Sequence, residues 1–355
     1  MDLARALRDS GHEVHVFAHR YETLKGLSFH SVAVPVKPFG LQSWVFAKNA
    51  RLAVDRNEFD IVNGLSQIYP QDVYRMGDGI HKHWLDQHPG NTFTRIWNTI
   101  SPRHRLILNI ERKIFTAENY KRIVAISHLC KQHAITYYNV PFNLIDVIYC
   151  GVNFDVFNSS VRNEGELLRK NLGIDRKTIV VLFVGMNFAR KGLASLLRAV
   201  SQLRDKERYR ILIIGKGNVP RYMKLARELG LNGICLFCGF QDGMPAFYGC
   251  ADVFVLPSYY EPLGNACLEA MACGLPVIAT RETGASELIL HGRSGFIMDN
   301  PENTLALANW LEALEDQDLR RSMGAVAQKQ VAFLTIERNV QQTILAYEKA
   351  LENKT

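Results

Sequence analysis

Apolar residues along the chain fall into short runs separated by amphipathic stretches, and this alternation occurs in two successive series. The first series predicts strands at Glu13–Phe17, Phe29–Val34, Ile61–Asn63 and Ile123–Ala125. The second series predicts strands at Ile179–Val184, Tyr209–Ile214, Ile234–Cys238, Val253–Leu256 and Val277–Ala279. Helices separate the strands, such as those at Leu193–Leu203 and Arg221–Leu229. This alternation is typical of α/β proteins with parallel, doubly wound sheets.

Length and composition predict two domains. The 355 residues exceed one typical domain, and a hydrophobic content of 47% is enough to form two cores. A break in the strand series divides the chain into an amino-terminal domain, 1–152, and a carboxy-terminal domain, 153–335. A last helix, at about Ile336–Leu351, occupies residues 336–355.

Two further features favour a cytoplasmic protein. The chain has no apolar run of about 18 residues, and its start shows no basic segment followed by an apolar core, so we expect neither a membrane-spanning helix nor a signal peptide. The seven cysteines are an odd number scattered through apolar stretches, which favours a reducing compartment. Cys235 and Cys238 form the only CxxC pair, and we interpret them as core residues of a buried strand.

The positive charge is uneven along the chain. The formal net charge is +7, and residues 1–150 hold 18 Lys and Arg against 13 Asp and Glu, a net +5. Residues 93–122 hold seven basic and two acidic residues among apolar ones. Their net charge of +5 equals the net charge of the whole segment 1–150. This stretch either docks on anionic lipid headgroups or phosphorylated glycolipid, or forms a core helix with a solvated basic face. Nucleic acid is not expected as a partner, because no recognition motif accompanies the charge.

Two carboxylates, Glu261 and Glu269, stand eight positions apart across the predicted start of a helix. Pro262 fits the first helical turn, where its missing N–H costs nothing. Gly264 and Asn265 add little bulk, so their amides can approach a bound group closely. The helix start then attracts an anion. Amides for a phosphate and carboxylates for hydroxyls together indicate a sugar-nucleotide site.

This segment closely resembles the Glu, seven residues, Glu signature of retaining glycosyltransferases with the GT-B fold, family four (group 1). Its flanks, residues 248–258 and 284–296, resemble the same family, and the similarity extends from Gly11–Phe17 to the final helix. The chain is similar to members that build the lipopolysaccharide core. The resemblance implies an acceptor-side and a nucleotide-sugar-binding domain, both Rossmann-like with doubly wound parallel sheets, facing a cleft. The last helix would cross back to the first domain.

The same resemblance implies the reaction. A hexose passes from a nucleotide-sugar, with UDP-hexose favoured, to a glycolipid or lipopolysaccharide-core acceptor, and configuration is retained because the acceptor attacks from the face that the nucleotide leaves. The nucleotide-sugar is a co-substrate, so no cofactor is expected, and no metal is expected either. The only Asp-x-Asp pair, Asp316 and Asp318, is interpreted as surface. The enzyme would be cytoplasmic, free or attached peripherally to the inner face of the membrane.

The resemblance also implies roles for individual residues. Glu261 contacts the transferred hexose, and Glu269 holds the ribose hydroxyls. Between them, Leu263, Gly264 and Asn265 present amides to phosphate or sugar. Catalysis would then rest largely on positioning and charge stabilisation.

A second phosphate-binding candidate follows the first strand of the second series. Arg190 and Lys191 can offer positive charge to a diphosphate leaving group, and Gly185 and Gly192 add no side chain to the loop. Lys191 matches the family position, but the family usually has an arginine where this chain has Met186. Arg190 is therefore the expected substitute; the alternative is that it only covers the helix surface.

Gly215, Lys216 and Gly217 resemble a fragment of a dinucleotide-binding fingerprint after a strand. Pro220 occupies the place of the third glycine, which disfavours a nicotinamide oxidoreductase. A match this short is more often a strand-to-helix turn. In the resembled family this loop lies near the nucleotide base, which makes Gly215 a candidate binding residue.

On the acceptor side, Asp78 and His81 follow a strand that begins near Asp72, in a glycine-flanked segment. Both side chains can hydrogen-bond hydroxyls. By resemblance, Asp78 lies where an acidic or histidine residue lines the cleft near the transferred sugar. The alternative is that the two residues cap the next helix.

The resemblance does not include the first strand of the family's amino-terminal domain. Family members open with a strand and a glycine-rich loop before the helix that Met1–Leu7 begins, so we expect an amino-terminal domain truncated at its start. Loss of a central parallel strand would expose apolar surface. Two alternatives to the transferase stay open: an inactive nucleotide-sugar-binding remnant without acceptor competence, and another GT-B enzyme such as a glucan synthase or sugar epimerase.

Overall fold

The computed structural model describes residues 2–35, 42–56, 58–87 and 101–352. It divides into two compact units. Unit 1 comprises Met1–Gly151 and Ile336–Thr355, and unit 2 comprises Val152–Thr335. No described helix combines the length and the apolar character that crossing a bilayer requires.

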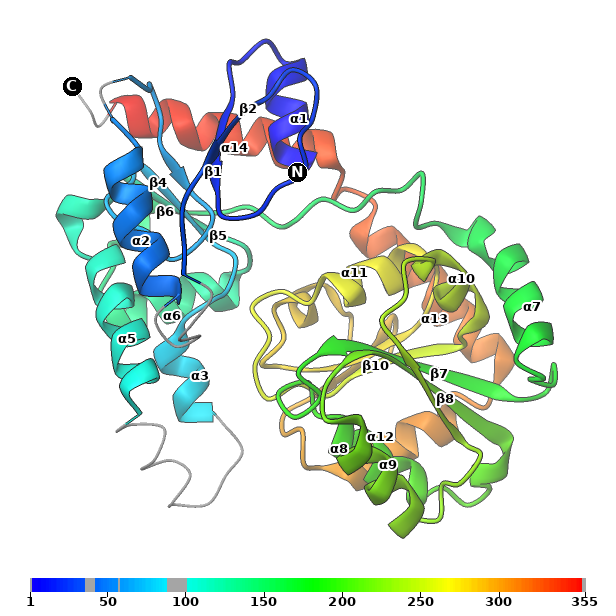
Figure 1. The fold of residues 1–355 in the computed structure, drawn as a ribbon. Coiled ribbons are helices and arrows are strands. Elements are labelled where there is room, and N and C mark those ends of the chain that lie inside the picture. The colour runs from blue at the N-terminus through cyan, green and yellow to red at the C-terminus, as the bar shows by residue number, and fades with distance from the viewer. Residues whose placement is uncertain (1, 36–41, 57, 88–100, 353–355) are drawn as a thin grey trace. The chain divides into compact units, whose positions relative to one another are not determined.

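Unit 2 is built on one sheet of six parallel strands (Figure 1). In spatial order these are β12 (Gly295–Met298), β11 (Val277–Thr280), β10 (Val253–Leu256), β7 (Ile179–Met186), β8 (Tyr209–Lys216) and β9 (Cys235–Gly239). The helices are α7 (Arg162–Asn171), α8 (Leu193–Ser201), α9 (Val219–Glu228), α10 (Met244–Cys250), α11 (Asn265–Ala272), α12 (Thr304–Ala313) and α13 (Gln317–Val331). Figure 1 shows α8, α9 and α12 on one face of the sheet and α10, α11 and α13 on the other. The predicted doubly wound sheet is confirmed.

Burial on both faces explains why these strands could be predicted. The side chains of β10 and β11 and most of those of β7 and β8 are buried, so the strands form continuous apolar runs. All five predicted strands are present to within two residues at either end. β12 was not predicted. Cys235 and Cys238 lie on the edge strand β9 and are only partly buried, so their assignment to a buried strand is wrong.

Unit 1 contains two parallel sheets. One has the order β3 (Asn63–Gly64), β4 (Val73–Met76), β5 (Arg122–Ala125) and β6 (Ile145–Val147), and the other pairs β1 (His15–Ala18) with β2 (Ser28–Ser31). The helices described are α1 (Asp2–Asp9), α2 (Gln42–Ala53), α3 (His81–Gln87), α5 (Pro102–Ile114), α6 (His128–Tyr138) and α14 (Ile336–Glu352). The strands predicted at Phe29–Val34 and Ile61–Asn63 are present in part, as β2 and β3.

The final helix, α14, packs on the four-stranded sheet of unit 1 (Figure 1). One buried cluster joins helix and sheet: Val73, Val124, Ile148, Ala346 and Ala350. At its rim, the Asn63 amide donates to the Tyr347 hydroxyl at 2.7 Å, and Lys349 Nζ lies 2.9 Å from Asp146 Oδ1. Alanines at the contact let the helix approach the sheet closely, so the end of the sequence completes the core of its beginning.

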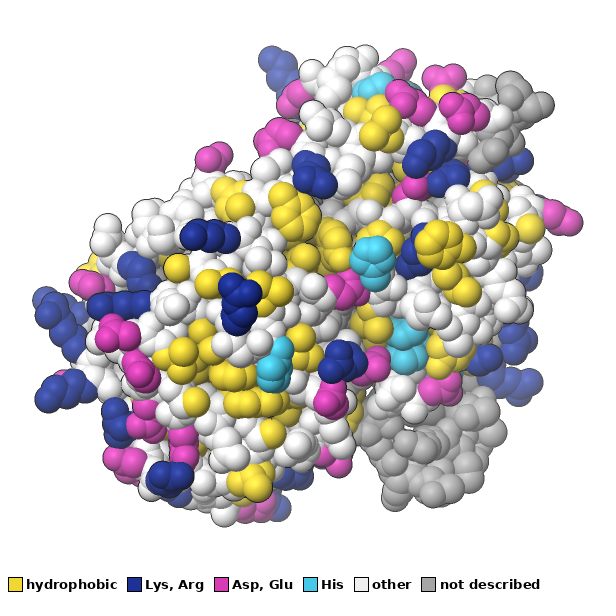
Figure 2. All heavy atoms as spheres, turned by 180° about the vertical axis from the view of Figure 1, so that it is seen from behind, with side chains coloured by type: hydrophobic (Ala, Val, Ile, Leu, Met, Phe, Trp, Pro, Cys, Tyr) yellow, Lys and Arg dark blue, Asp and Glu magenta, His cyan; other side chains and the backbone are white. Residues whose placement is uncertain are grey.

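The basic stretch 93–122 is described only in part, because residues 88–100 lie outside the described residues. Its helix α5 buries an apolar face and exposes Arg103, Arg105, Arg112 and Lys113. Arg122 does not belong to that basic face, because it is buried on β5 with its Nη2 2.7 Å from Asp146 Oδ2. On the face shown in Figure 2, basic and acidic side chains are interspersed.

Candidate functional site

The loop after β10 carries Glu261 into the start of α11. Gly264 has a left-handed conformation (φ 85°) and directly precedes the helix, which begins at Asn265. The prediction that Pro262 opens the helix is wrong, because the left-handed glycine separates the proline from the first helical turn. Glu269 accordingly stands about one turn into the helix, whereas a helix that started at Pro262 would place it about two turns in.

Main-chain hydrogen bonds hold this loop against the segment after β11. The Glu261 N–H donates to the Glu282 carbonyl at 2.8 Å, and the Gly284 N–H donates to the Glu261 carbonyl at 2.9 Å. Farther along, the Ala285 N–H donates to the Leu263 carbonyl at 2.7 Å. Because both sides of Glu261 are bonded, the position of its side chain is set by the fold.

Two cations converge on the Glu261 carboxylate. Lys191 Nζ forms an ion pair with Glu261 Oε2, and Arg190 Nη1 lies 3.2 Å from the same oxygen. The side chains are largely buried, with 10% of Lys191, 13% of Glu261 and 25% of Arg190 exposed. Arg190 also donates to the Tyr260 carbonyl at 3.2 Å. The structure thus brings together three of the predicted residues, and Arg190 faces the site instead of covering a helix surface.

The start of α11 lies beside this charge cluster. In the described part of the chain, the N–H groups of Leu263, Gly264 and Asn265 donate to no other residue. Gly264 provides no capping side chain. Free amides and the positive end of the helix dipole together favour an anion at this position.

Glu269 lies on α11 and is held by a residue that the sequence analysis missed. The Tyr248 hydroxyl, fully buried on α10, donates to Glu269 Oε2 at 2.6 Å. Burial raises the pKa of Glu269, and the Tyr248 hydrogen bond opposes that rise. Among the described residues Tyr248 is its one side-chain partner, so the second carboxylate oxygen can accept from a ligand hydroxyl. Tyr248 lies in a segment that resembles the family. Its hydrogen bond to Glu269 was not predicted, because the two residues are far apart along the chain.

Three glycines near the carboxyl ends of β7 and β8 have packing roles. A Cβ on Gly215 would lie 2.0 Å from the Gly185 carbonyl oxygen of the paired strand, and a Cβ on Gly185 would lie 2.8 Å from Lys191 Cγ. Gly192 has φ 75°, and its Cβ would lie 1.8 Å from the Pro257 carbonyl oxygen. These glycines therefore let the strands and loops approach closely enough to place Lys191, whatever they contribute to a ligand.

In unit 1, Asp78 and His81 follow β4. Asp78 is exposed and makes no side-chain hydrogen bond or ion pair to another described residue. His81 is half-buried; its Nε2 lies 3.0 Å from His104 Nδ1, and its ring stacks on Trp84. Burial, reinforced by His104 and Arg103, lowers the pKa of His81 to about 4, so the imidazole is neutral at pH 7.

Glu111 caps α3, although the sequence had indicated only that it is one of two acidic residues in the basic stretch 93–122. The Glu111 carboxylate, buried on α5, accepts from the backbone N–H groups of His81 and Lys82. The alternative that Asp78 caps this helix is therefore wrong. Glu111 lies one position after the buried Ile110, on the stripe that continues at Ile114, and an acidic residue on such a stripe is a signal that the sequence does carry.

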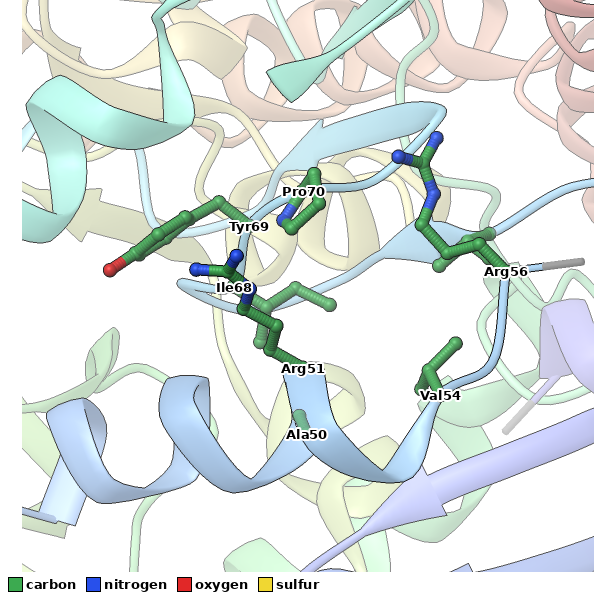
Figure 3. Close-up of a pocket in the computed structure, with 8 residues that line it drawn as sticks. Ala50, Arg51, Val54, Arg56, Ile68, Tyr69 and Pro70 are labelled. Carbon is green, nitrogen blue, oxygen red and sulfur yellow. The ribbon is translucent and has the colours of Figure 1, made fainter. Parts of the chain in front are cut away.

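A cavity of about 190 Å³ in unit 1 includes none of the predicted residues (Figure 3). It lies at the amino end of β4, whereas Asp78 follows the carboxyl end of the same strand. Its lining is mostly apolar, with two arginines: Ala50, Arg51, Val54, Arg56, Val62, Ile68, Tyr69 and Pro70. Ligands of parallel sheets bind at the carboxyl ends of strands, so this cavity is not the candidate site.

The Asp-x-Asp pair has a structural role. Asp316 is the N-cap of α13, and its Oδ1 accepts from the Asp318 and Leu319 N–H groups at 2.8 and 3.1 Å. A capping carboxylate of this kind satisfies the open end of its own helix.

The chain is similar to known glycosyltransferases over most of its length. Residues 165–330 match the family described as Glycosyl transferases group 1, and residues 1–156 match Glycosyltransferase Family 4. An uncharacterised glycosyltransferase, MJ1607, of Methanocaldococcus jannaschii is 30% identical over 65% of this chain and 60% of its own length. D-inositol 3-phosphate glycosyltransferase of Corynebacterium diphtheriae is 30% identical over 73% of this chain and 67% of its own. The match thus spans less than two thirds of the first relative's length.

Solved structures show the same fold. WaaG, a glycosyltransferase involved in lipopolysaccharide biosynthesis, superposes with a TM-score of 0.85 at 21% identity, covering 97% of this chain and 93% of that one. Anabaena Alr3699/HepE in complex with UDP-glucose superposes with a TM-score of 0.73 at 22% identity, covering 97% and 94%. At these identities the likeness establishes the GT-B fold, as the sequence predicted, and leaves the substrates open.

Proposed function

The chain belongs to the group 1 glycosyltransferases, and from this premise we propose that it moves a hexose from a UDP-sugar to a glycolipid or lipopolysaccharide-core acceptor. We further propose that transfer retains the anomeric configuration and needs no metal ion. The observation that carries the proposal is the convergence of Lys191 and Arg190 on Glu261 beside the amides at the start of α11, which donate to none of the described residues.

The charges of this cluster suit a diphosphate. Two cations against one carboxylate leave a local charge of +1, and the helix dipole adds to it. Lys191 and Arg190 would then stabilise the negative charge that develops on the leaving phosphate, a task that in other enzymes falls to a metal ion. Because these two side chains can supply the positive charge that a metal ion would otherwise provide, the cluster supports a metal-independent reaction.

The two glutamates suit the sugar parts of the donor. Glu261 stands beside the cations, where its carboxylate can accept from hydroxyls of the transferred hexose. Within the described part of the chain one Glu269 oxygen accepts from no other residue, and Tyr248 fixes the orientation of the carboxylate, so Glu269 can hold a ribose hydroxyl. UDP is the proposed nucleotide because HepE, a protein of the same fold, was solved with UDP-glucose.

The acceptor is proposed from the whole-chain likeness to WaaG and from Asp78. The likeness covers nearly all of both chains. Asp78 is an exposed carboxylate at the carboxyl end of β4, where it can accept from an acceptor or hexose hydroxyl. Peripheral membrane attachment is proposed through the exposed cations of α5. Cosedimentation with phosphatidylglycerol vesicles, but not with phosphatidylcholine vesicles, would support it, and equal recovery with both would oppose it.

Donor binding can be tested by thermal shift of the full chain with UDP-glucose, UDP-galactose, UDP-N-acetylglucosamine and GDP-mannose. A ligand that binds the folded state raises Tm by mass action. We expect a shift with one UDP-sugar, lost in Glu269→Ala and kept in Glu228→Ala, whose side chain is exposed on α9. A shift with GDP-mannose alone would reject UDP, and no shift with any donor would reject the proposed donor site.

Transfer is tested by incubating that donor with lipopolysaccharide core and reading the product by NMR. An α-linked product from an α-linked donor, formed equally in EDTA, is expected. Inversion at the anomeric carbon or loss of activity in EDTA would overturn the corresponding part of the proposal. Donor binding without transfer would instead indicate the inactive remnant, and a changed free sugar nucleotide without acceptor would indicate an epimerase.

A further inference from the structure

We propose that Glu111 is a positioning residue for the acceptor side, holding the turn that carries Asp78 and His81 by means of its buried carboxylate. This inference rests on the proposed function, because it takes Asp78 and His81 to face acceptor or hexose. Glu111 itself acts through the backbone of its neighbours and is assigned no contact with a substrate.

The carboxylate has three donors around it. Oε2 accepts from the His81 N–H, while Oε1 accepts from the Lys82 N–H at 3.1 Å and from the Tyr138 hydroxyl. Glu111 is on α5 and Tyr138 on α6, so the contacts join two helices to the start of a third, α3. The turn after β4 is thereby fixed at its far end.

Burial makes this arrangement costly. Glu111 is only 3% exposed, and burial raises its pKa, while its hydrogen bonds with Tyr138, His81 and Lys82 oppose that rise. A buried carboxylate is normally retained only where its hydrogen bonds compensate its lost hydration. If α5 only packed against its neighbours, an apolar residue at this position would stabilise the fold more than glutamate does. The three hydrogen bonds therefore explain why the position holds a glutamate.

The geometry of the turn explains why its anchor matters. Residues 77 and 78 form a turn, Gly79 has φ 69°, and Ile80 is fully buried, so the segment between Asp78 and the helix adopts one specific backbone conformation. The exposed Asp78 therefore depends on a fixed backbone on either side of it: β4 before it and the His81 amide after it. If the Glu111 contact is lost, the turn can shift while the sheet stays intact.

Glu111→Gln is the direct test, since it keeps the shape and replaces one acceptor oxygen by a donor. The His81 and Lys82 N–H groups can only donate, and they bond to different oxygens of Glu111, so the amide must leave at least one of them unmatched. We expect the KM for acceptor to rise about tenfold or more, the scale of a lost charge-assisted hydrogen bond. The KM for the UDP-sugar should stay within about twofold. Glu118→Gln, an exposed acid in the 3-10 turn after α5, is the matched control and should change neither value.

Two further measurements separate positioning from simple stability. Tyr138→Phe removes one of the three donors and leaves both amide contacts, so it should raise the acceptor KM less than Glu111→Gln. In NMR spectra of ¹⁵N-labelled protein, the amide chemical shifts of His81 and Lys82 should differ from wild type in Glu111→Gln and match wild type in Glu118→Gln. If Glu111→Gln fails to fold, Glu111→Asp, which remains acceptor-only but is one methylene shorter, takes its place in both measurements.

The outcomes are distinct. Wild-type protein that transfers no sugar would reject the proposed function, and the amide signals would still decide whether Glu111 anchors the turn. Wild-type activity with an unchanged acceptor KM in the folded Glu111 variant would overturn the positioning role. An equal rise of donor and acceptor KM would also overturn it, because a general loss of structure predicts that result.

Discussion

Lys191 Nζ and Glu261 Oε2 form an ion pair that joins the loop after β7 to the loop before α11. The two residues stand 70 positions apart, and Arg190 strengthens the contact by donating to the Tyr260 carbonyl across the same separation. Since neighbouring parallel strands end at the same edge of the sheet, the fold places both loops together. The cluster is thus a consequence of the order of strands.

Replacing Lys191 by alanine should lower kcat/KM for transfer about 100-fold. Loss of one preformed donor to a developing anion costs roughly 10²–10³ in rate. Arg190→Ala should cost less, because Arg190 is more exposed and shares its charge with the Tyr260 carbonyl. Initial rates at several donor concentrations check both values.

The control for this experiment is Lys224→Ala in the same unit. Its side chain is 72% exposed and lies 3.8 Å from Glu228, a contact of little energetic weight. Rates within twofold of wild type are expected. If Lys191→Ala were as active as Lys224→Ala, the proposed phosphate site would be wrong.

The sequence predicted the strands of unit 2 well for a physical reason. Helices cover both faces of this sheet, so β10 is apolar at every position and stands out from its surroundings. In unit 1 the strands are short, and β3 has only two residues. The apolar run at Ile61–Asn63 therefore predicted the approximate position of β3 but not its bounds.

The site could be predicted only in part. Residue types at Glu261, Glu269 and Lys191 indicated the chemistry, but two competing rules obscured the helix start. Proline is favoured in the first helical turn, whereas a glycine with positive φ lies just outside a helix, and at Gly264 the second rule prevailed. The contacts of Tyr248 with Glu269 and of Glu111 with the start of α3 were not predicted, because a contact between residues distant in the chain leaves no periodicity in the sequence. Only the position of Glu111 on a buried apolar stripe was a signal of its role.

Stability should depend on pH through Glu269. Its pKa in the folded state is raised above the usual 4.5 by burial, so the folded protein binds this proton more tightly than the unfolded chain does. The resulting stabilisation is fully present below pH 4.5 and is lost as pH rises through the folded-state pKa. Glu269→Gln does not titrate, so its Tm should exceed that of wild type by a margin that grows with pH.

Thermal melts of both proteins at intervals from pH 4.5 to 8 measure this margin. Subtracting one Tm from the other cancels the remaining titrating groups, including the buried Glu111. A difference that stays constant over the range would show that Glu269 is not perturbed. Donor affinity should fall in the same variant, because an amide is a weaker acceptor for a hydroxyl than a carboxylate.

A charge introduced on the buried side of α14 should destabilise the protein. Ala346 is 1% exposed and lies in the cluster with Val73 and Val124. Ala346→Asp buries an unpaired carboxylate and should lower the free energy of unfolding by on the order of 3 kcal/mol or more. Leu345→Asp, at a neighbouring side chain that is 54% exposed, is the control and should cost under about 1 kcal/mol. Urea unfolding compares the two, and equal losses would contradict the packing of this helix on the sheet.

Gly192→Ala should separate steric from conformational strain. Gly192 and Gly173 both have positive φ, 75° and 64°. A Cβ on Gly192 would lie 1.8 Å from the Pro257 carbonyl oxygen, whereas one on Gly173 would meet none of the described residues within 4 Å. Gly173→Ala should therefore cost only the left-handed conformation, about 1 kcal/mol, and Gly192→Ala on the order of 3 kcal/mol or more. Because Gly192 follows Lys191, only Gly192→Ala should also weaken UDP-sugar binding; equal losses of stability with unchanged binding in both variants would mean that the loop tolerates a side chain beside β10.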